Sequence, residues 1–357
     1  MRFPISWRPP ATWHFFRSDD RLLLIAAGAI VGICSGMAAV ALNQALIAAL
    51  GWLRPYRSFG WAFLLPAIGA ALSSLFLNKV MREGAGHGVP EVIYSVSRYG
   101  GLMRFRSSFS RLISSCLTIG SGGSAGPEAP IVMSGSAIGS NIARLLGLND
   151  RQRVALVGCG AAGAISAIFN APIAGLIFAM EVILGEWAAS NLIPIAIAAV
   201  AGTEISHLLQ GKQIPFSHHD FNITSVDIVA CIGLAVFTAL ASIMLTRTIR
   251  AVHHQANGIQ LPSWLKAACG GCAVGLIGLY LPMVLGEGYH AIREMMEGQF
   301  TPGISLVFLA LLAKIIATAL TLGSGGSGGI FAPCLVIGSF VGLTYHRALA
   351  FLWPGVD

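Results

Sequence analysis

Two glycine-rich segments of the sequence combine residue types that suit the binding of a small anion. Each reads Gly-Ser-Gly-Gly-Ser, at Gly120–Ser124 and at Gly323–Ser327, and an Ala-Pro pair follows each. Glycine lets the backbone approach a bound species closely, and proline early in a helix leaves neighbouring N–H groups free to point forward. Such a helix start carries about half a positive charge. It can bind an anion weakly enough for the anion to leave again, which conduction requires.

Glu128 lies beside the first of these segments, within Gly126–Pro130 and between apolar stretches. An ionisable side chain at membrane depth costs on the order of 2.5–3.5 kcal/mol on insertion scales, so it indicates a functional site. Next to helix starts, its carboxylate could occupy the place of a permeant anion and act as a gate. The alternatives are that the glycines only allow close helix packing and that Glu128 is an exposed loop residue.

The composition indicates which elements position these groups. Of the 357 residues, 55% are hydrophobic and 10% are charged, against roughly 25% charged in a soluble domain. Runs such as Leu22–Leu53 and Val226–Leu245 reach the length of a membrane-spanning helix. We therefore predict a polytopic, all-α membrane protein, and a soluble enzyme is excluded.

The positive charge of the chain indicates orientation in the membrane. The net charge is +7, with the basic residues in clusters between apolar runs, which predicts cytoplasmic loops rather than nucleic-acid binding. Four arginines precede the first run and place the N-terminus in the cytoplasm: Arg2, Arg8, Arg17 and Arg21.

Ten apolar stretches are predicted to be helical: 22–53, 61–78, 108–119, 129–147, 154–168, 172–209, 226–246, 264–285, 304–322 and 331–353. Those at 108–119 and 154–168 are too short to cross a hydrocarbon core of about 30 Å at about 1.5 Å per residue. We expect them to be tilted or partial helices that pack inside the protein.

An internal repeat organises the chain. Arg111–Gly139 and Lys314–Gly342, offset by 203 residues, are identical at 14 of 29 positions. Duplicated halves with interrupted helices are typical of transporters, whose site lies where the repeats meet. We predict a cytoplasmic segment 1–21, a first membrane repeat 22–210, a connector 211–224 and a second repeat 225–357. The second repeat is expected to be incomplete, because it stops 15 residues after Gly342.

The motifs resemble those of the CLC family of chloride channels and proton/chloride antiporters, in the family order. Gly86–Pro90 resembles the family's GSGIP segment, Gly126–Pro130 resembles G(K/R)EGP, and Gly329–Pro333 matches GxFxP. Asn170–Gly175 resembles a further family segment. The resemblance implies a homodimer of subunits with inverted repeats in a bacterial inner membrane, with one chloride pathway per subunit.

By matching of motifs, the resemblance makes Glu128 the gating glutamate. It implies anion contacts from seven further residues: Gly86, His87, Gly88, Gly126, Ala129, Ile330 and Phe331. His87 stands where the family often has a serine, and Pro127 replaces a basic residue and removes one N–H. The histidine leaves the anion preference open, so fluoride and nitrate transport are alternatives to chloride, and the proline is expected to weaken the outer anion site.

A second departure concerns proton coupling. Proton-coupled relatives use a second carboxylate, and the matching position here is Val182, directly after Glu181. This valine favours passive conduction. Proton-coupled antiport with Glu181 as a relay is the alternative.

The rival from another class is an intramembrane hydrolase with Ser121 or Ser124 as nucleophile and one of nine histidines as base. The pair Cys269 and Cys272 lacks partners at ligand spacing, so neither a metal nor another cofactor is predicted.

Overall fold

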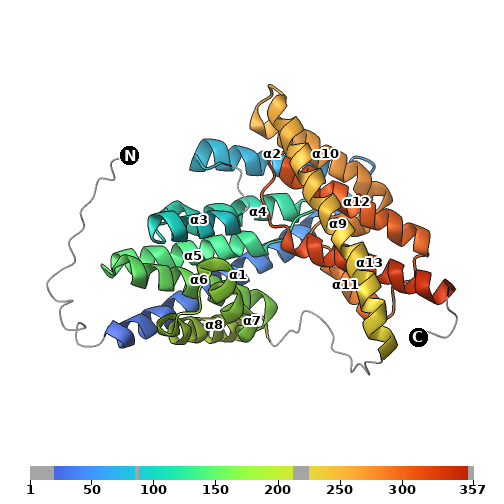
Figure 1. Cartoon of the computed structure of the whole chain (residues 1–357). Helices are drawn as coiled ribbons and strands as arrows, with labels where there is room; N and C mark the ends of the chain where they lie inside the picture. The colour runs from blue at the N-terminus through green and yellow to red at the C-terminus, as the bar shows by residue number, and fades with distance from the viewer. Residues whose placement is uncertain (1–19, 85–87, 212–224, 353–357) are drawn as a thin grey trace. The chain divides into compact units, whose positions relative to one another are not determined.

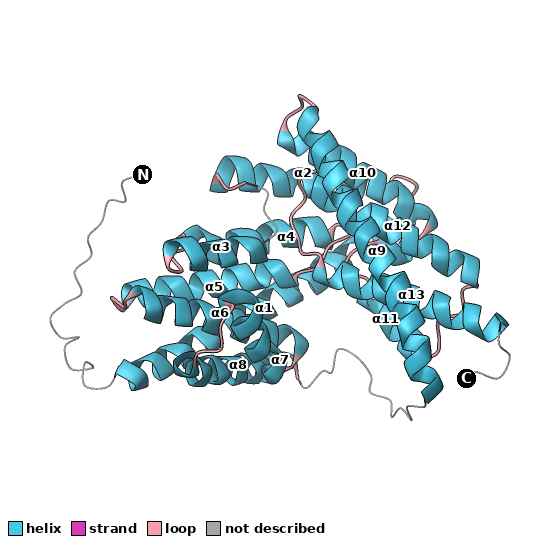
Figure 2. Cartoon of the chain, viewed as in Figure 1, coloured by secondary structure: helices cyan, strands magenta, loops and turns pink. Residues whose placement is uncertain are grey.

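The computed structural model describes residues 20–84, 88–211 and 225–352 (Figure 1). Every regular element in these residues is a helix, and Figure 2 shows helices joined by loops. Eight helices within these described ranges are long and apolar enough to cross a membrane. The predicted all-α, polytopic fold is therefore confirmed. Most of the predicted N-terminal segment 1–21 and of the connector 211–224 lies outside the described residues.

The described residues form thirteen α-helices, and their bounds are as follows: α1 Asp20–Leu53, α2 Leu64–Leu75, α3 Val89–Tyr99, α4 Ser110–Gly120, α5 Glu128–Leu145, α6 Asp150–Phe169, α7 Pro172–Phe178, α8 Ala189–Gln210, α9 Ser225–Gly258, α10 Ser263–Tyr280, α11 Tyr289–Met296, α12 Ile304–Gly323 and α13 Phe331–Leu352. Two π-helical segments, η3 (Phe76–Met81) and η5 (Ala179–Leu184), extend α2 and α7.

The helices pack into two compact units that each draw on several parts of the chain. Unit 1 comprises Met1–Ala41, Gly88–Phe109 and Ile131–Gln213, and unit 2 comprises Leu42–His87, Ser110–Pro130 and Ile214–Asp357. These units are defined by packing. The division into two sequence repeats at 22–210 and 225–357 stays a prediction.

In unit 1, small residues let the helix backbones approach closely. A Cβ atom added to Gly139 of α5 would lie 2.0 Å from the carbonyl oxygen of Leu156 on α6. One added to Gly202 of α8 would lie 2.3 Å from the carbonyl oxygen of Gly163. Such contacts are how membrane helices associate where burial of apolar surface gives no driving force. The glycine content of these helices is thus explained by packing.

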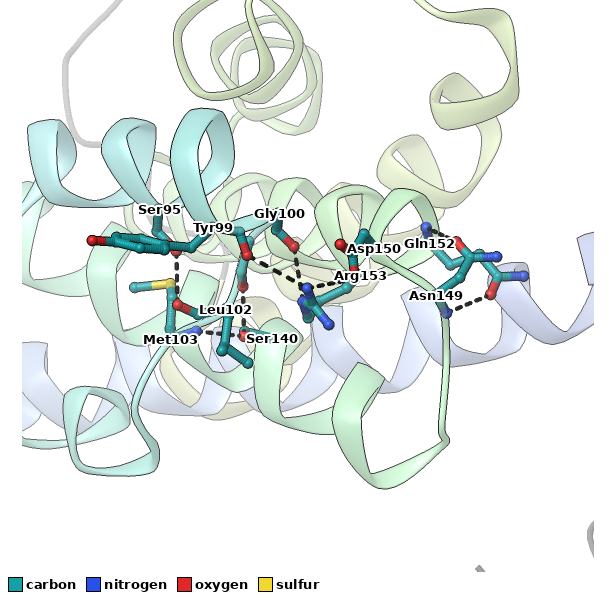
Figure 3. Close-up of polar contacts among 11 residues, drawn as sticks. Ser95, Tyr99, Gly100, Leu102, Met103, Ser140, Asn149, Asp150, Gln152 and Arg153 are labelled. Atoms are coloured by element: carbon teal, nitrogen blue, oxygen red, sulfur yellow. Dashed lines mark hydrogen bonds and ion pairs between the residues drawn. The ribbon is translucent and has the colours of Figure 1, made fainter. Parts of the chain in front are cut away.

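Polar contacts fix the turns of unit 1 around the start of α6 (Figure 3). Asn149 and Gln152 bond each other's backbone N–H groups and so cap the helix. The Arg153 side chain donates to the carbonyl of Gly100 at 2.8 Å. Ser140 of α5 donates to the carbonyl of Gly101 at 2.6 Å and accepts from the N–H of Met103. The turn that follows α3 is therefore held by both α5 and α6.

Unit 2 is built around α12, which packs against α9, α10 and α13. Its helices also approach closely: a Cβ added to Gly275 of α10 would lie 2.0 Å from the carbonyl oxygen of Phe63, just before α2. A cluster of buried apolar side chains joins α9, α11, α12 and α13, with Val307 and Phe340 fully buried in it. This packing positions both glycine-rich segments, since α4, the start of α5, α12 and α13 all belong to unit 2.

Several predicted helix boundaries were wrong. The stretch 172–209 is interrupted after η5 and restarts at α8. The stretch at 154–168 belongs to a 20-residue helix, α6, that is long enough to span a membrane, whereas α4 is short as predicted. The helices α3 and α11 were missed, because both are short and mix charged with apolar residues. The search for apolar runs finds only helices that are apolar on all sides.

Candidate functional site

The two glycine-rich segments have the same local structure. In each, one helix ends, a short irregular segment follows, and a second helix begins at residues 203 apart: α5 begins at Glu128 and α13 at Phe331. Gly122 and Gly325 lie at equivalent points, with φ of 113° and 110°. Glycine adopts such angles without strain. The duplication seen in the sequence is thus also a duplication of backbone conformation.

Backbone hydrogen bonds join the two segments reciprocally. The N–H of Gly126 donates to the carbonyl oxygen of Gly329 at 2.8 Å, and the N–H of Gly329 donates to that of Gly126 at 2.7 Å. The two residues form an antiparallel bridge and are counterparts in the repeat. The repeats therefore meet in opposite directions at this point, as inverted halves would.

A second pair of reciprocal hydrogen bonds joins the two segments, and here hydroxyl groups are the acceptors. Thr321 accepts a hydrogen bond from the N–H of Ser124 at 3.0 Å, and Thr118 accepts one from the N–H of Ser327 at 3.2 Å. The Ser114 hydroxyl also donates to that of Ser327 at 2.8 Å. All five residues are buried, so these contacts satisfy polar groups that would otherwise lack partners. They fix the register in which the two repeats meet.

The position of Gly126 explains why no side chain stands there. The resemblance implies an anion contact for this residue, but its N–H is engaged with Gly329 in this structure. A Cβ added to Gly126 would lie 2.1 Å from Oε2 of Glu128 and 2.9 Å from Cβ of Ala332. The role that the structure gives to Gly126 is to leave room for the Glu128 carboxylate.

Glu128 is enclosed by protein, with 2% of its surface exposed. Its Oε1 accepts a hydrogen bond from the Tyr289 hydroxyl at 2.5 Å. Its Oε2 has no hydrogen bond of ordinary geometry to the residues that the structure describes. The backbone amide of Ala332 also faces the carboxylate. Glu128 is thus a buried group and not an exposed loop residue.

The Glu128 carboxylate stands at the start of α13. Ala332 is the second residue of that helix, and Ile330 and Phe331 precede it directly. The N–H groups of a first helical turn lack partners within the helix and present positive partial charge. A carboxylate in this place occupies a position suited to a small anion. The arrangement can therefore bind either the side chain or an anion, but not both.

Tyr289 binds Glu128, and Lys314 holds the loop before Tyr289; neither residue was predicted from the sequence. Tyr289 is the first residue of α11. Lys314 of α12 is fully buried, and its Nζ donates to the carbonyl oxygens of Val284 at 3.0 Å and Gly286 at 2.9 Å. The lysine therefore anchors the loop that leads into Tyr289.

Lys314 has a counterpart in the first repeat. Arg111 lies 203 residues earlier, is also buried, and donates to the carbonyl oxygen of Gly84 at 2.9 Å. In both repeats, a cation at the same helical position thus binds the loop that precedes a Gly-x-Gly motif. Equivalent buried cations in the two repeats were the signal that could have drawn attention to Lys314.

The other residues predicted for the site either lie outside the described residues or take no part in the hydrogen bond between Glu128 and Tyr289. Gly86 and His87 lie outside the described residues. Gly88 begins α3 within unit 1, where its N–H donates to Glu91 at 3.0 Å. Glu181 lies in η5 of the same unit and is exposed. Ala129, the second residue of α5, is buried beside Gly329 in unit 2.

The two serines proposed as nucleophiles of a hydrolase both form hydrogen bonds to residues of the helices. The Ser121 hydroxyl donates to the carbonyl oxygen of Thr118 at 2.9 Å, and Ser124 shares a hydrogen bond of 3.0 Å with the Thr318 hydroxyl. Neither partner is a base that could activate a nucleophile. The Ser121 hydroxyl thus bonds within its own segment, and Ser124 joins that segment to α12 of the second repeat.

Comparisons with known proteins agree on one family. The family model described as voltage gated chloride channel matches residues 69–357. A putative chloride channel protein, ClcB-like, from Ralstonia nicotianae is 28% identical over 348 residues, which cover 93% of this chain and 80% of the relative. The uncharacterized protein MJ0305 of Methanocaldococcus jannaschii is 33% identical over 291 residues, 79% of this chain and 70% of the relative.

Two solved structures share the fold. A slow cyanobacterial Cl⁻/H⁺ antiporter matches with a TM-score of 0.81 and 21% identity, over 94% of this chain and 81% of the other. A CLC-type fluoride/proton antiporter matches with a TM-score of 0.79 and 22% identity, over 93% of this chain and 82% of the other. At these identities the likeness extends to the fold alone.

Proposed function

Because the chain belongs to the voltage gated chloride channel family, we propose that this integral membrane protein carries chloride and other small anions through a site that Glu128 gates. The observation that carries the proposal is the buried Glu128 carboxylate at the start of α13, next to the Ala332 amide. A single side chain there competes with the anion for the same partial charges. Movement of this side chain away from α13 would open the site.

The mode of transport has two candidates. Passive conduction is favoured by Val182, which stands where the resemblance implies a proton-relaying carboxylate. Proton-coupled exchange is favoured by a second acidic residue in unit 2, Glu287, which interacts electrostatically with Glu128. The two modes differ in one measurable quantity, the number of protons that move for each anion.

Assembly and orientation belong to the same proposal. We propose a homodimer with one pathway in each subunit, in a bacterial inner membrane with the N-terminus in the cytoplasm. The support comes from the family and from the arginines that precede α1.

Ion flux from liposomes tests the proposed function directly. The purified chain, reconstituted in liposomes loaded with chloride, fluoride or nitrate, is expected to release chloride well above the rate of protein-free liposomes. Each anion is followed with an ion-selective electrode after a potassium ionophore removes the opposing voltage. An absence of anion release contradicts the proposal, and release of fluoride far ahead of chloride overturns the proposed substrate.

Tyr289→Phe is expected to raise the rate of chloride release at neutral pH. The substitution removes the hydroxyl that holds Glu128 in place, and hydrogen bonds to charged groups contribute about 1.5–3 kcal/mol. A loss at the lower end of this range corresponds to roughly tenfold more open sites. The rate is measured in the same liposomes.

Tyr345→Phe serves as the matched control for this variant. Tyr345 lies on α13 of the same unit, where its ring packs against Phe237. This control is expected to release chloride at the original rate. Equal rates for Tyr289→Phe and the unmodified chain would exclude a role of the hydroxyl in holding the gate.

A further inference from the structure

A second acidic residue, Glu287, lies between the two groups that surround the site. Its neighbour Gly286 accepts a hydrogen bond from Lys314, and Tyr289, two residues further on, donates one to Glu128. The loop is also tied to the first glycine-rich segment, since the N–H of Gly286 donates to the carbonyl oxygen of Gly122 at 3.2 Å. Glu287 is thus held at a fixed place beside the proposed gate.

The charges around Glu287 come from three other elements. Glu128 of α5 and Lys314 of α12 both interact with it electrostatically, and Tyr289 of α11 interacts with both carboxylates. The cluster therefore contains one lysine, which faces Glu287, and two carboxyl groups. If both were ionised, the cluster would hold one uncompensated negative charge in surroundings of low polarity, which is unfavourable. A single shared proton brings the cluster to neutrality.

Glu128 also offers an atom that can hold this proton. Its Oε2 is buried and lacks a hydrogen bond of ordinary geometry within the described residues. The other oxygen, Oε1, already accepts the hydrogen bond from the Tyr289 hydroxyl, so we place the proton on Oε2. Two interacting carboxyl groups then titrate as a pair, and a change at one affects the other.

From this arrangement we propose that Glu287 is a second proton-binding carboxyl group of the anion pathway, which shares a proton with Glu128 and couples proton movement to anion movement. The inference rests on the proposed function. In the transfer, an O–H bond breaks at one carboxyl group and one forms at the other. Protonated Glu128 loses its attraction to the start of α13, and an anion takes its place. Coupling thus arises without a carboxylate at position 182.

The test measures proton uptake and chloride release together. The full chain in liposomes is placed in a chloride gradient with no pH gradient, and the external pH is recorded beside external chloride. The unmodified chain is expected to move protons against the direction of chloride. Glu287→Gln is expected to lower proton uptake relative to chloride release by on the order of a hundredfold.

Glu181→Gln, beside Val182, tests the alternative relay, and the matched control is Glu204→Gln, which changes an exposed carboxyl group of α8. Both variants are expected to keep the ratio of protons to chloride. If Glu287→Gln does not purify as a monodisperse protein, Glu287→Ala, which removes the polar group altogether, carries the same expectation. A role of Glu287 confined to pairing with Lys314 would change thermal stability and leave the ratio unaltered.

The outcomes separate the inference from the function on which it rests. Without chloride release by the unmodified chain, the proposed function fails. Chloride release without proton uptake, or an unchanged ratio in the Glu287 variants, overturns the inference and leaves chloride transport in place. Loss of coupling in Glu181→Gln alone would assign the proton to Glu181 instead.

Discussion

Replacement of Glu128 by glutamine is expected to raise chloride release at neutral pH and to remove its dependence on pH. In the unmodified chain, release should fall as pH rises, because the ionised carboxylate returns to the start of α13. The amide of glutamine carries no charge at any pH, so it competes with chloride no better than a protonated carboxyl group. The substitution removes a charge-assisted hydrogen bond of about 1.5–3 kcal/mol. Since about 1.4 kcal/mol corresponds to a factor of ten, we expect the rate of chloride release to rise at least tenfold.

The measurement is the initial rate of chloride release from liposomes over a series of pH values. Glu204→Gln, which changes an exposed carboxyl group of α8, is the control and is expected to reproduce the original profile. A Glu128→Gln profile that still falls with pH would remove Glu128 from the role of gate. Combination with Tyr289→Phe should add nothing, since both changes release the same side chain.

Lys314→Met is expected to destabilise the protein severely. The lysine is fully buried and is bound to two carbonyl oxygens, and it faces Glu287. Removal of one member of a buried charged pair typically costs about 3–5 kcal/mol, because the other member stays buried without its partner. The readout is the melting temperature in detergent together with the fraction of monodisperse protein.

Lys79→Met provides the comparison, because Lys79 is exposed at the end of η3. This variant should melt close to the unmodified chain. Lys314→Arg, which keeps the charge, should have a melting temperature between those of Lys314→Met and Lys79→Met. Melting of Lys314→Met at the original temperature would show that the loop before Tyr289 is held by other contacts.

The sequence predicted those features of the site that repeat along the chain. An offset of 203 residues relates Gly126 to Gly329 and Thr118 to Thr321, and the structure joins these residues and their neighbours by reciprocal bonds. Motifs that are near in sequence also sufficed to single out Glu128. The long apolar helices followed from composition, because a bilayer requires about 20 apolar residues.

The partners of Glu128 could not be predicted in this way. Tyr289 lies 161 residues from Glu128 in sequence, and a valine, Val89, follows the corresponding Gly-x-Gly motif of the first repeat. It reaches the carboxylate only because Lys314 holds the preceding loop and α11 packs on α13. Such contacts depend on how helices pack together, and one sequence contains no pattern for them. The same holds for α3 and α11, whose polar residues conceal short helices.

The reciprocal bonds between Gly126 and Gly329, with their flanking threonine contacts, constrain how the protein can operate. Separation of the two repeats here would leave several buried donors and acceptors unmatched, at about 1–3 kcal/mol each. The contact between the two glycine-rich segments is therefore expected to stay in place during transport. The only motion that the proposed gate then needs is rotation of the Glu128 side chain. Side-chain rotations are faster than the microsecond to millisecond hinge motions of whole domains. The transport rate should then depend on how often the site is occupied by an anion, and domain motions should not limit it.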